Sequence, residues 1–162
     1  MARIPENRAV LRSVLDRLTD GAAPPAPGKT SAQSVRDLKQ SVRRDLENLL
    51  NTRWRCTSWP PDLKMLDSSL VNYGIPDFSG ANLGNAATRE EFRKLLEKAI
   101  TVFEPRFLKV SVRVAEAPDP VDRTLRFRID AILRAEPTPE PVRFDTAIEP
   151  TTAAFSVKRV ER

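Results

Sequence analysis

The segment Phe103-Glu104-Pro105-Arg106-Phe107 divides the sequence into a helical part and a strand part. Apolar residues before it recur at helical spacing, as Phe92, Leu95, Leu96, Ala99, Ile100 and Phe103. Apolar residues after it alternate with polar ones, as Leu108, Val110, Val112 and Val114. Pro105 has no N–H and disfavours the α conformation at Glu104, so we expect the helix to end at or just before Glu104. The sequence therefore predicts a rigid helix–strand corner flanked by two opposite charges.

Four strands are expected after the corner, at 107–114, 123–134, 142–148 and 152–159, with proline-containing turns between the first and second and between the second and third. Each strand has one apolar side, and the second is the clearest, with Leu125, Phe127, Ile129, Ala131 and Leu133. One apolar face per strand is typical of an antiparallel sheet whose other face meets water. We therefore predict an α+β fold, with N-terminal helices packed on one face of a mostly antiparallel three- to four-stranded C-terminal sheet. The last strand is expected at an edge, which is either shielded or available to another chain.

The N-terminal part is predicted to be a helix joined to the main domain by a linker. Residues 1–20 contain a short amphipathic helix whose apolar side includes Leu11, Leu15 and Leu18. Residues 21–33 are rich in Pro, Gly and Ala and predict a semi-extended linker. Residues 34–162 then form the α+β domain. The tethered helix either packs on its own domain or docks on another protein, and the sequence leaves both open.

Polar residues mark the predicted starts of the two long helices in the main domain. Ser34 can cap a helix over 34–50, and Thr88 with Glu91 forms a capping box for the helix that ends at the corner. The segment 71–80 alternates turn-forming residues with large apolar ones. We expect the apolar side chains of that segment to fix it against the core; they are Tyr73, Ile75 and Phe78.

Composition excludes several kinds of site. Among 162 residues there is no histidine and one cysteine, Cys56, which excludes a histidine general base, an internal disulfide and a cysteine zinc site. Gly28-Lys29-Thr30 resembles the end of a phosphate loop, but the position of its first glycine is Ala23, so no cofactor or metal is predicted. No apolar run approaches the ~20 residues of a membrane helix, and no signal peptide is evident. We expect a soluble cytoplasmic protein without direct membrane insertion.

A glycosidase is the first alternative function. Such an enzyme places two carboxylates roughly 5–9.5 Å apart across a sugar cleft, one of them with a raised pKa. The candidates are Asp77, Glu90, Glu91 and Glu97. Three of them are expected on a helix among lysines and arginines, which favour the ionised form. We therefore predict no catalytic residue.

A basic nucleic-acid-binding module is the second alternative. The net charge is +5, and the strand at 123–134 carries three arginines on its polar side. Recognition of this kind needs exposed aromatic residues beside the basic ones. Phe127, Phe144 and Phe155 instead fall on the apolar sides of their strands. We therefore predict no nucleic-acid partner.

Four segments, in their order and spacing, resemble the small baseplate wedge subunits of contractile injection machines. They are Ser13–Leu18, Ser41–Arg53, Val71–Gly80 and Glu104-Pro105-Arg106. The sequence is similar to the lysozyme-like wedge family of contractile phage tails, and most of all to its type VI secretion members. The resemblance extends over nearly the whole chain.

The resemblance implies assembly and not catalysis. It implies a place in the baseplate on the cytoplasmic side of the inner membrane, and a role in priming sheath polymerisation. The implied partners are two larger wedge subunits (TssF- and TssG-like), a baseplate-to-membrane adaptor, contractile sheath subunits and the inner tube. It assigns a role in wedge assembly to Glu104, Pro105 and Arg106, and makes the helix with Leu11, Leu15 and Leu18 a docking element. From the residues alone, a local ion pair between Glu104 and Arg106 is the simpler interpretation.

Overall fold

The computed structural model describes residues 18, 31–54, 60, 62–78, 81, 84–115, 124–135, 138–149, 152 and 154–160. The helices are α2 (Ser31–Asn51) and α3 (Ala86–Phe103), with short 3-10 helices η1 (Lys64–Ser68) and η2 (Leu70–Asn72) between them. The strands are β1 (Phe107–Ala115), β2 (Leu125–Leu133), β3 (Glu140–Ile148) and β4 (Phe155–Arg159). Leu11, Leu15 and most of the predicted linker lie outside the described residues, as do Cys56 and Trp59.

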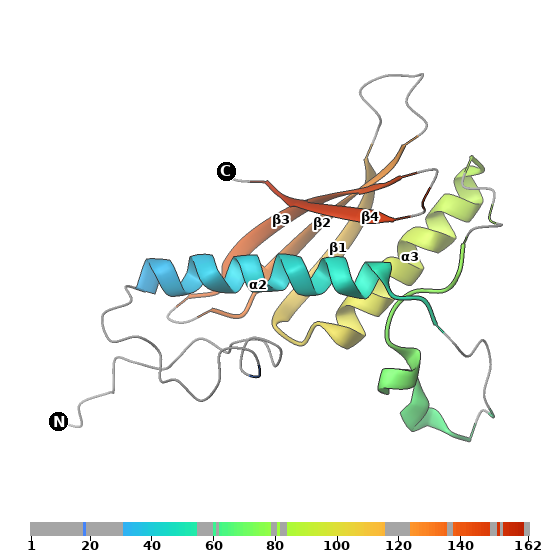
Figure 1. Ribbon diagram of the computed structural model, residues 1–162, viewed down its shortest axis with the longest axis horizontal. Helices are drawn as coiled ribbons and strands as arrows, with labels where there is room; N and C mark the ends of the chain where they lie inside the picture. Colours follow the sequence, from blue (N-terminus) through green and yellow to red (C-terminus); the bar gives the residue numbers. More distant parts are fainter. Residues whose placement is uncertain are drawn as a thin grey trace.

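The four strands form one antiparallel sheet in the order β1-β2-β3-β4. Helix α2 packs against β4 at one margin of the sheet, and α3 packs against β1 at the other. Figure 1 shows α2 crossing the sheet and α3 leading directly into β1. This arrangement confirms the predicted α+β fold with helices on one face of an antiparallel sheet.

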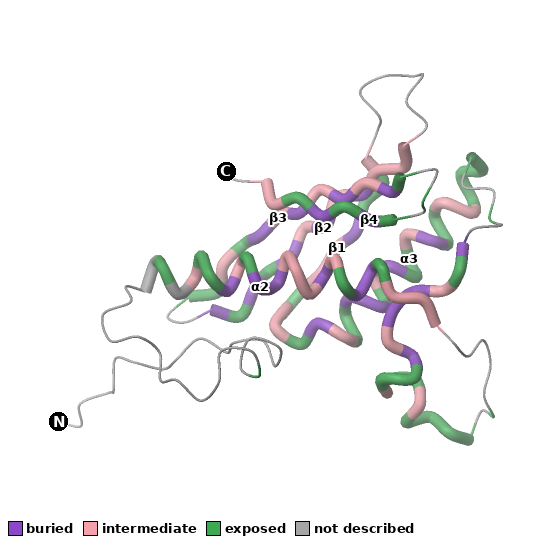
Figure 2. Tube along the Cα trace, in the orientation of Figure 1, coloured by how far each residue is buried: buried purple, intermediate pink, exposed green. Residues whose placement is uncertain are grey.

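The core lies between the two helices and the inward face of the sheet. In β2 and β3 the alternating apolar residues face the core as predicted, and all are buried except Leu125, which is partly buried. Figure 2 shows buried segments where helices and strands face each other. Phe92 of α3 contacts the ring of Phe127 on β2, with 5.8 Å between centroids, and that of Phe78, with 4.9 Å. The largest fully buried side chains in the described part of the chain are Phe127, Phe144, Leu46, Leu50, Ile75, Leu96, Ile100, Ile129, Leu133, Val42 and Val112.

Strand β1 departs from the predicted alternation at its start. The pairing with β2 shifts register between Phe107 and Lys109, so β1 has a bulge there. A bulge adds one residue to its strand and re-aims the side chains next to it. Phe107 therefore packs on the core, whereas Leu108 is 50% exposed. The prediction that Leu108 faces the core was wrong for this reason.

Both long helices begin earlier than their predicted caps. Helix α3 starts at Ala86, because the side chain of Asn85 accepts a hydrogen bond of 2.9 Å from the N–H of Ala87. Asparagine is among the best N-cap residues, and it precedes the predicted cap Thr88 by three positions. Helix α2 starts at Ser31, so Ser34 lies inside the helix.

The loop after η2 is held by backbone pairing as well as by the predicted apolar contacts. Ile75 and Phe78 are buried and Tyr73 packs against the core, which confirms the prediction. The backbone of Ile75 also pairs with the segment after α2, donating to Thr52 O (2.9 Å) and accepting from Trp54 N–H (3.0 Å). The indole N–H of Trp54 donates to Gly74 O over 2.8 Å, so this tryptophan fixes the loop.

Candidate functional site

The helix–strand corner at 104–106 is built by the end of α3. The N–H of Glu104 closes the last helical turn on Ile100 O (2.9 Å), and Glu104 O then accepts from Phe107 N–H (3.2 Å). The helix therefore ends just before Glu104, as Pro105 predicts. Pro105 itself is exposed and forms the outer tip of the corner.

Glu104 and Arg106 form an ion pair directed into the molecule. The guanidinium Nε of Arg106 donates to Glu104 Oε1 over 2.6 Å, and Nη2 donates to Glu104 Oε2. The backbone N–H of Arg106 also donates to Glu104 Oε1 over 3.2 Å. The exposed fraction of the side chain is 5% for Glu104 and 12% for Arg106, so both charges are largely shielded from water.

Arg106 also connects the corner to helix α2, far earlier in the chain. Its Nη2 donates to Asp45 Oδ2 over 2.7 Å, and its Nη1 donates to Ser41 Oγ over 3.2 Å. One guanidinium thus joins α2, the end of α3 and the start of β1. We call Ser41, Asp45, Glu104 and Arg106 the corner network.

Two opposing effects act on the charge of Arg106. Burial alone would lower the pKa of Arg106, because it disfavours the charged form. Together, the hydrogen bonds and negative charges of Glu104 and Asp45 outweigh the effect of burial and raise the pKa of Arg106. Arg106 is therefore a permanent cation in the corner network.

Tyr73 lies beside the corner network and responds to its charges. Its ring makes an edge-on contact with Phe103, with 5.4 Å between centroids. Burial raises the pKa of Tyr73, and the negative charges of Asp45 and Glu104 raise it further, while Arg106 opposes them. The tyrosinate anion is thus disfavoured at this position in the folded protein.

Tyr73 is expected to titrate at higher pH in the folded chain than in the chain unfolded by guanidinium. It is the only tyrosine, so the ultraviolet absorbance of tyrosinate reports it alone. The unfolded chain loses the phenol proton at a lower pH than the folded chain. The raised pKa therefore contributes fully to the free energy of unfolding below the ordinary pKa of about 10, and this contribution declines as the pH rises above it. Asp45→Asn should lower the pKa of Tyr73 toward its ordinary value. Identical titration curves for the folded and unfolded chains would contradict this placement.

Three exposed apolar residues lie at or next to the corner in the chain. Val102 on the last turn of α3 is 39% exposed, and Leu108 on the bulge of β1 is 50% exposed. Pro105 lies between them in the chain and is also exposed. We call Val102, Pro105 and Leu108 the corner rim. Leu18 from the predicted docking helix is 76% exposed, and nothing described connects it with the corner.

Two of the carboxylates considered for a glycosidase, Glu90 and Glu97, serve as ion-pair partners. Glu90 and Glu97 both bind Arg93, at 2.9 and 2.8 Å. The hydrogen bond from Arg93 lowers the pKa of Glu90, the opposite of what a general acid requires. A described cavity of about 240 Å³ at the β3–β4 turn has Glu149 as the single carboxylate in its lining. Among the described residues, no group of acidic or cysteine side chains is arranged to hold a metal ion.

Two arginines on the outer face of the sheet are paired with acidic residues of the neighbouring strand. Arg128 binds Asp145 over 2.8 Å, and Arg143 binds Asp130 over 2.6 Å. These pairs use charges that a nucleic-acid surface would direct to phosphates. Within the described part of the chain, no helix is both long and apolar enough to cross a membrane.

The chain was compared with known proteins by sequence and by structure. A sequence model of the family described as "Baseplate wedge protein gp25" matches residues 36–138, which include most of α2 and all of α3, the corner network, β1 and β2. A solved structure, titled "The baseplate complex from the type VI secretion system", is 18% identical with a TM-score of 0.48. It covers 70% of this chain and 96% of the matched chain. A comparison with curated proteins gave no significant match. Since the family match spans more than half of the sequence, the chain belongs to the gp25 family of baseplate wedge proteins.

Proposed function

We propose that this chain is the TssE-like wedge subunit of a type VI secretion baseplate, binding the two larger wedge subunits through the corner rim. The proposal rests on membership of the gp25 family together with one observation, which is the shielded corner network beneath an exposed apolar tip. In this proposal Glu104 and Arg106 act from inside by fixing the corner. Pro105 is the member of the Glu-Pro-Arg segment that touches a partner.

Rigidity supports a binding role for the rim. Val102 and Leu108 lie on either side of a proline turn that is tied to α2 by Arg106. A surface that is ordered before binding loses little conformational entropy when its partner arrives. Apolar side chains on such a surface fit the buried centre of an assembly interface better than the charged outer face of the sheet does.

Leu108→Asp is expected to abolish co-purification with the larger wedge subunits while leaving the thermal melt of the purified chain unchanged. The side chain is half exposed, so a carboxylate there stays hydrated in the free chain but would be buried without a partner in the interface. Met65→Asp is the matched control, because Met65 is an exposed apolar residue on η1 and lies outside the rim. Retention of both wedge subunits by Leu108→Asp would exclude the rim as their binding surface.

We also propose, as the finer part of the same function, that the sheet primes sheath polymerisation by presenting ordered strands to the first sheath subunits. The ordered antiparallel sheet supports this proposal, since its strands are the kind of template on which another chain can add. Truncation of 150–162 would not test it, because Phe155 and Val157 are buried in the core. The test is sheath assembly in cells that carry Lys158→Glu and Ser156→Glu, two substitutions of exposed side chains on β4. Normal sheath lengths and numbers in such cells would argue against a sheath contact at β4.

A further inference from the structure

The outer edge of β4 carries backbone groups that point away from the sheet. Glu149 N–H donates to Ala154 O, and Val160 N–H donates to Arg143 O, so these residues of the β4 segment pair with β3. Neighbouring residues of an antiparallel strand direct their backbone groups to opposite sides. The N–H and C=O groups of Phe155 and Val157 therefore point outward, where a further strand could add.

Side chains of α2 form hydrogen bonds with those outward-pointing backbone groups at both residues. The amide of Asn51 makes two hydrogen bonds with Phe155, accepting from its N–H over 2.8 Å and donating to its C=O over 3.0 Å. One turn earlier, Arg43 donates to Val157 O over 3.2 Å, and Glu47 accepts from Val157 N–H over 3.4 Å. Arg43 and Glu47 also pair with each other at 3.0 Å.

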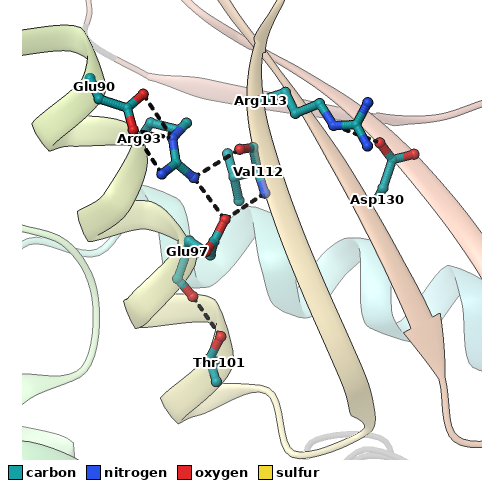
Figure 3. A network of polar contacts seen from close by, with 7 residues as sticks. All are labelled: Glu90, Arg93, Glu97, Thr101, Val112, Arg113 and Asp130. Atoms are coloured by element: carbon teal, nitrogen blue, oxygen red, sulfur yellow. Dashed lines mark hydrogen bonds and ion pairs between the residues drawn. The ribbon is translucent and has the colours of Figure 1, made fainter.

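The opposite edge of the sheet, at β1, is closed in the same way by α3. Arg93 donates to Val112 O over 3.0 Å, and Glu97 accepts from Val112 N–H over 2.9 Å. Arg93 and Glu97 pair with each other over 2.8 Å, and Arg93 is held in addition by Glu90. Figure 3 shows both side chains reaching from α3 to the backbone of the single residue Val112.

The two edges share one chemical arrangement. In each, an arginine and a glutamate four residues later on a helix satisfy the C=O and the N–H of one strand residue. A neighbouring antiparallel strand would supply the same pair of hydrogen bonds, because residues of a hydrogen-bonded pair exchange both N–H···O contacts. Each helix thus supplies, at one residue of the edge strand, the two hydrogen bonds that a neighbouring strand would make.

We propose that these two side-chain groups are edge plugs that prevent a second copy of this chain from pairing with the sheet. The α2 plug is Arg43, Glu47 and Asn51, and the α3 plug is Arg93 and Glu97. An uncovered edge strand is a template for strand addition, and an exposed edge in a free subunit would join copies in solution. The plugs keep the free chain monomeric, and any chain that adds a strand at Val112 or Val157 must displace them. This inference rests on contacts within the chain and does not depend on the proposed function.

Removing a plug is expected to make the chain self-associate. We expect Arg93→Ala/Glu97→Ala, and separately Arg43→Ala/Glu47→Ala/Asn51→Ala, to give a species of doubled mass that grows with protein concentration in sedimentation equilibrium. The wild-type chain should sediment as an 18.2 kDa monomer over the same concentrations. Plug variants that are folded by circular dichroism and stay monomeric throughout would overturn the proposal, as would a wild-type chain that dimerises.

Matched controls separate edge closure from the loss of an ion pair. Lys39→Ala/Glu140→Ala removes a pair of 2.9 Å between α2 and β3 that touches no outward backbone group of the edge. Glu90→Ala removes a partner of Arg93 but leaves the contacts with Val112 in place. Both controls should remain monomeric, and self-association of either one to the same extent as the plug variants would overturn the edge assignment.

A measurement on the wild-type chain keeps the test decisive if the multiple variants fail to fold. The amides of Val112, Phe155 and Val157 lie at sheet edges, yet each donates to a plug side chain. We expect their hydrogen exchange, measured residue by residue by NMR, to be at least about tenfold slower than in the unfolded chain. In Asn51→Ala the amide of Phe155 should lose this protection while that of Val112 keeps it. Unprotected amides at all three positions in the wild type would overturn the proposal.

Discussion

Replacing Arg106 by alanine is expected to lower the free energy of unfolding by about 3–5 kcal/mol, the cost of leaving a buried charge without its partner. Glu104 is 4% exposed, and Arg106 supplies the guanidinium hydrogen bonds to its carboxylate. The substitution also removes the contacts with Asp45 and Ser41 on α2. Urea unfolding, with the wild type and the variant compared at one pH, measures the difference.

A double-mutant cycle identifies the cause of this loss. Glu104→Gln in the Arg106→Ala background removes the unpaired charge, so we expect it to recover part of the lost stability. The surface control is Arg113→Ala, because Arg113 is 72% exposed and lies 3.9 Å from Asp130. That variant should change stability by no more than about 0.5 kcal/mol. If Arg106→Ala behaves like Arg113→Ala, the corner network does not hold α2 to the corner.

Replacing Gly74 by alanine is expected to give the second largest loss of stability. The φ of Gly74 is +114°, a backbone conformation that costs other residues on the order of 1–3 kcal/mol. A Cβ at this position would also lie 2.4 Å from Thr52 O. That carbonyl accepts the N–H of Ile75, so relief of the clash would break the pairing that fixes the loop.

The consequence of Gly74→Ala can be separated from general loop damage. Pro76→Ala changes a neighbouring position in the same loop and serves as the control. We expect the melting temperature to fall by several degrees more for Gly74→Ala than for Pro76→Ala, as a loss of about 1 kcal/mol shifts a domain of this size by roughly 2–8 °C. Equal melting temperatures for the two variants would show that the backbone at Gly74 is not strained by a side chain.

The regular part of the fold could be predicted from the sequence because it depends on local periodicity. Alternation in 125–133 predicted which side chains face the core, and the structure buries all of them except Leu125, which is partly buried. Pro105 fixed the end of α3 for a local stereochemical reason. The bulge at Leu108 could not be predicted, because it arises from the pairing of β1 with β2 and not from the composition of β1.

It could not be predicted either that the charged side chains of Glu104 and Arg106 point into the molecule. Glu104 and Arg106 are neighbours in the sequence, and an ion pair between them was one of the two interpretations. The burial of that pair depends on Asp45, which lies 61 residues before Arg106 in the chain. Nothing in the sequence around Asp45 indicates this contact. The edge plugs escaped prediction for the same reason. Arg93 and Glu97 read as ordinary charges on a solvated helix until their partner Val112 is known.

Burial of the pair changes how an interface role is best tested. Charge reversal at Arg106 would leave three carboxylates close together in a shielded site, so loss of binding could follow from loss of the fold. Leu108 and Val102 offer the same corner to a partner without entering the network. Any effect of an Arg106 substitution on assembly is therefore expected to follow its effect on the stability of the corner. The effect of Leu108→Asp on assembly is expected to be independent of stability.

The most direct test of the corner as the wedge interface is hydrogen exchange of the wild-type chain, free and assembled with the larger wedge subunits. We predict that amides in 101–109 gain protection on assembly, since Val102, Pro105 and Leu108 lie there. Amides of β3, already paired on both sides within the sheet, should change little. Unchanged exchange over 101–109 in a stable assembly would contradict the account and place the interface elsewhere on the chain.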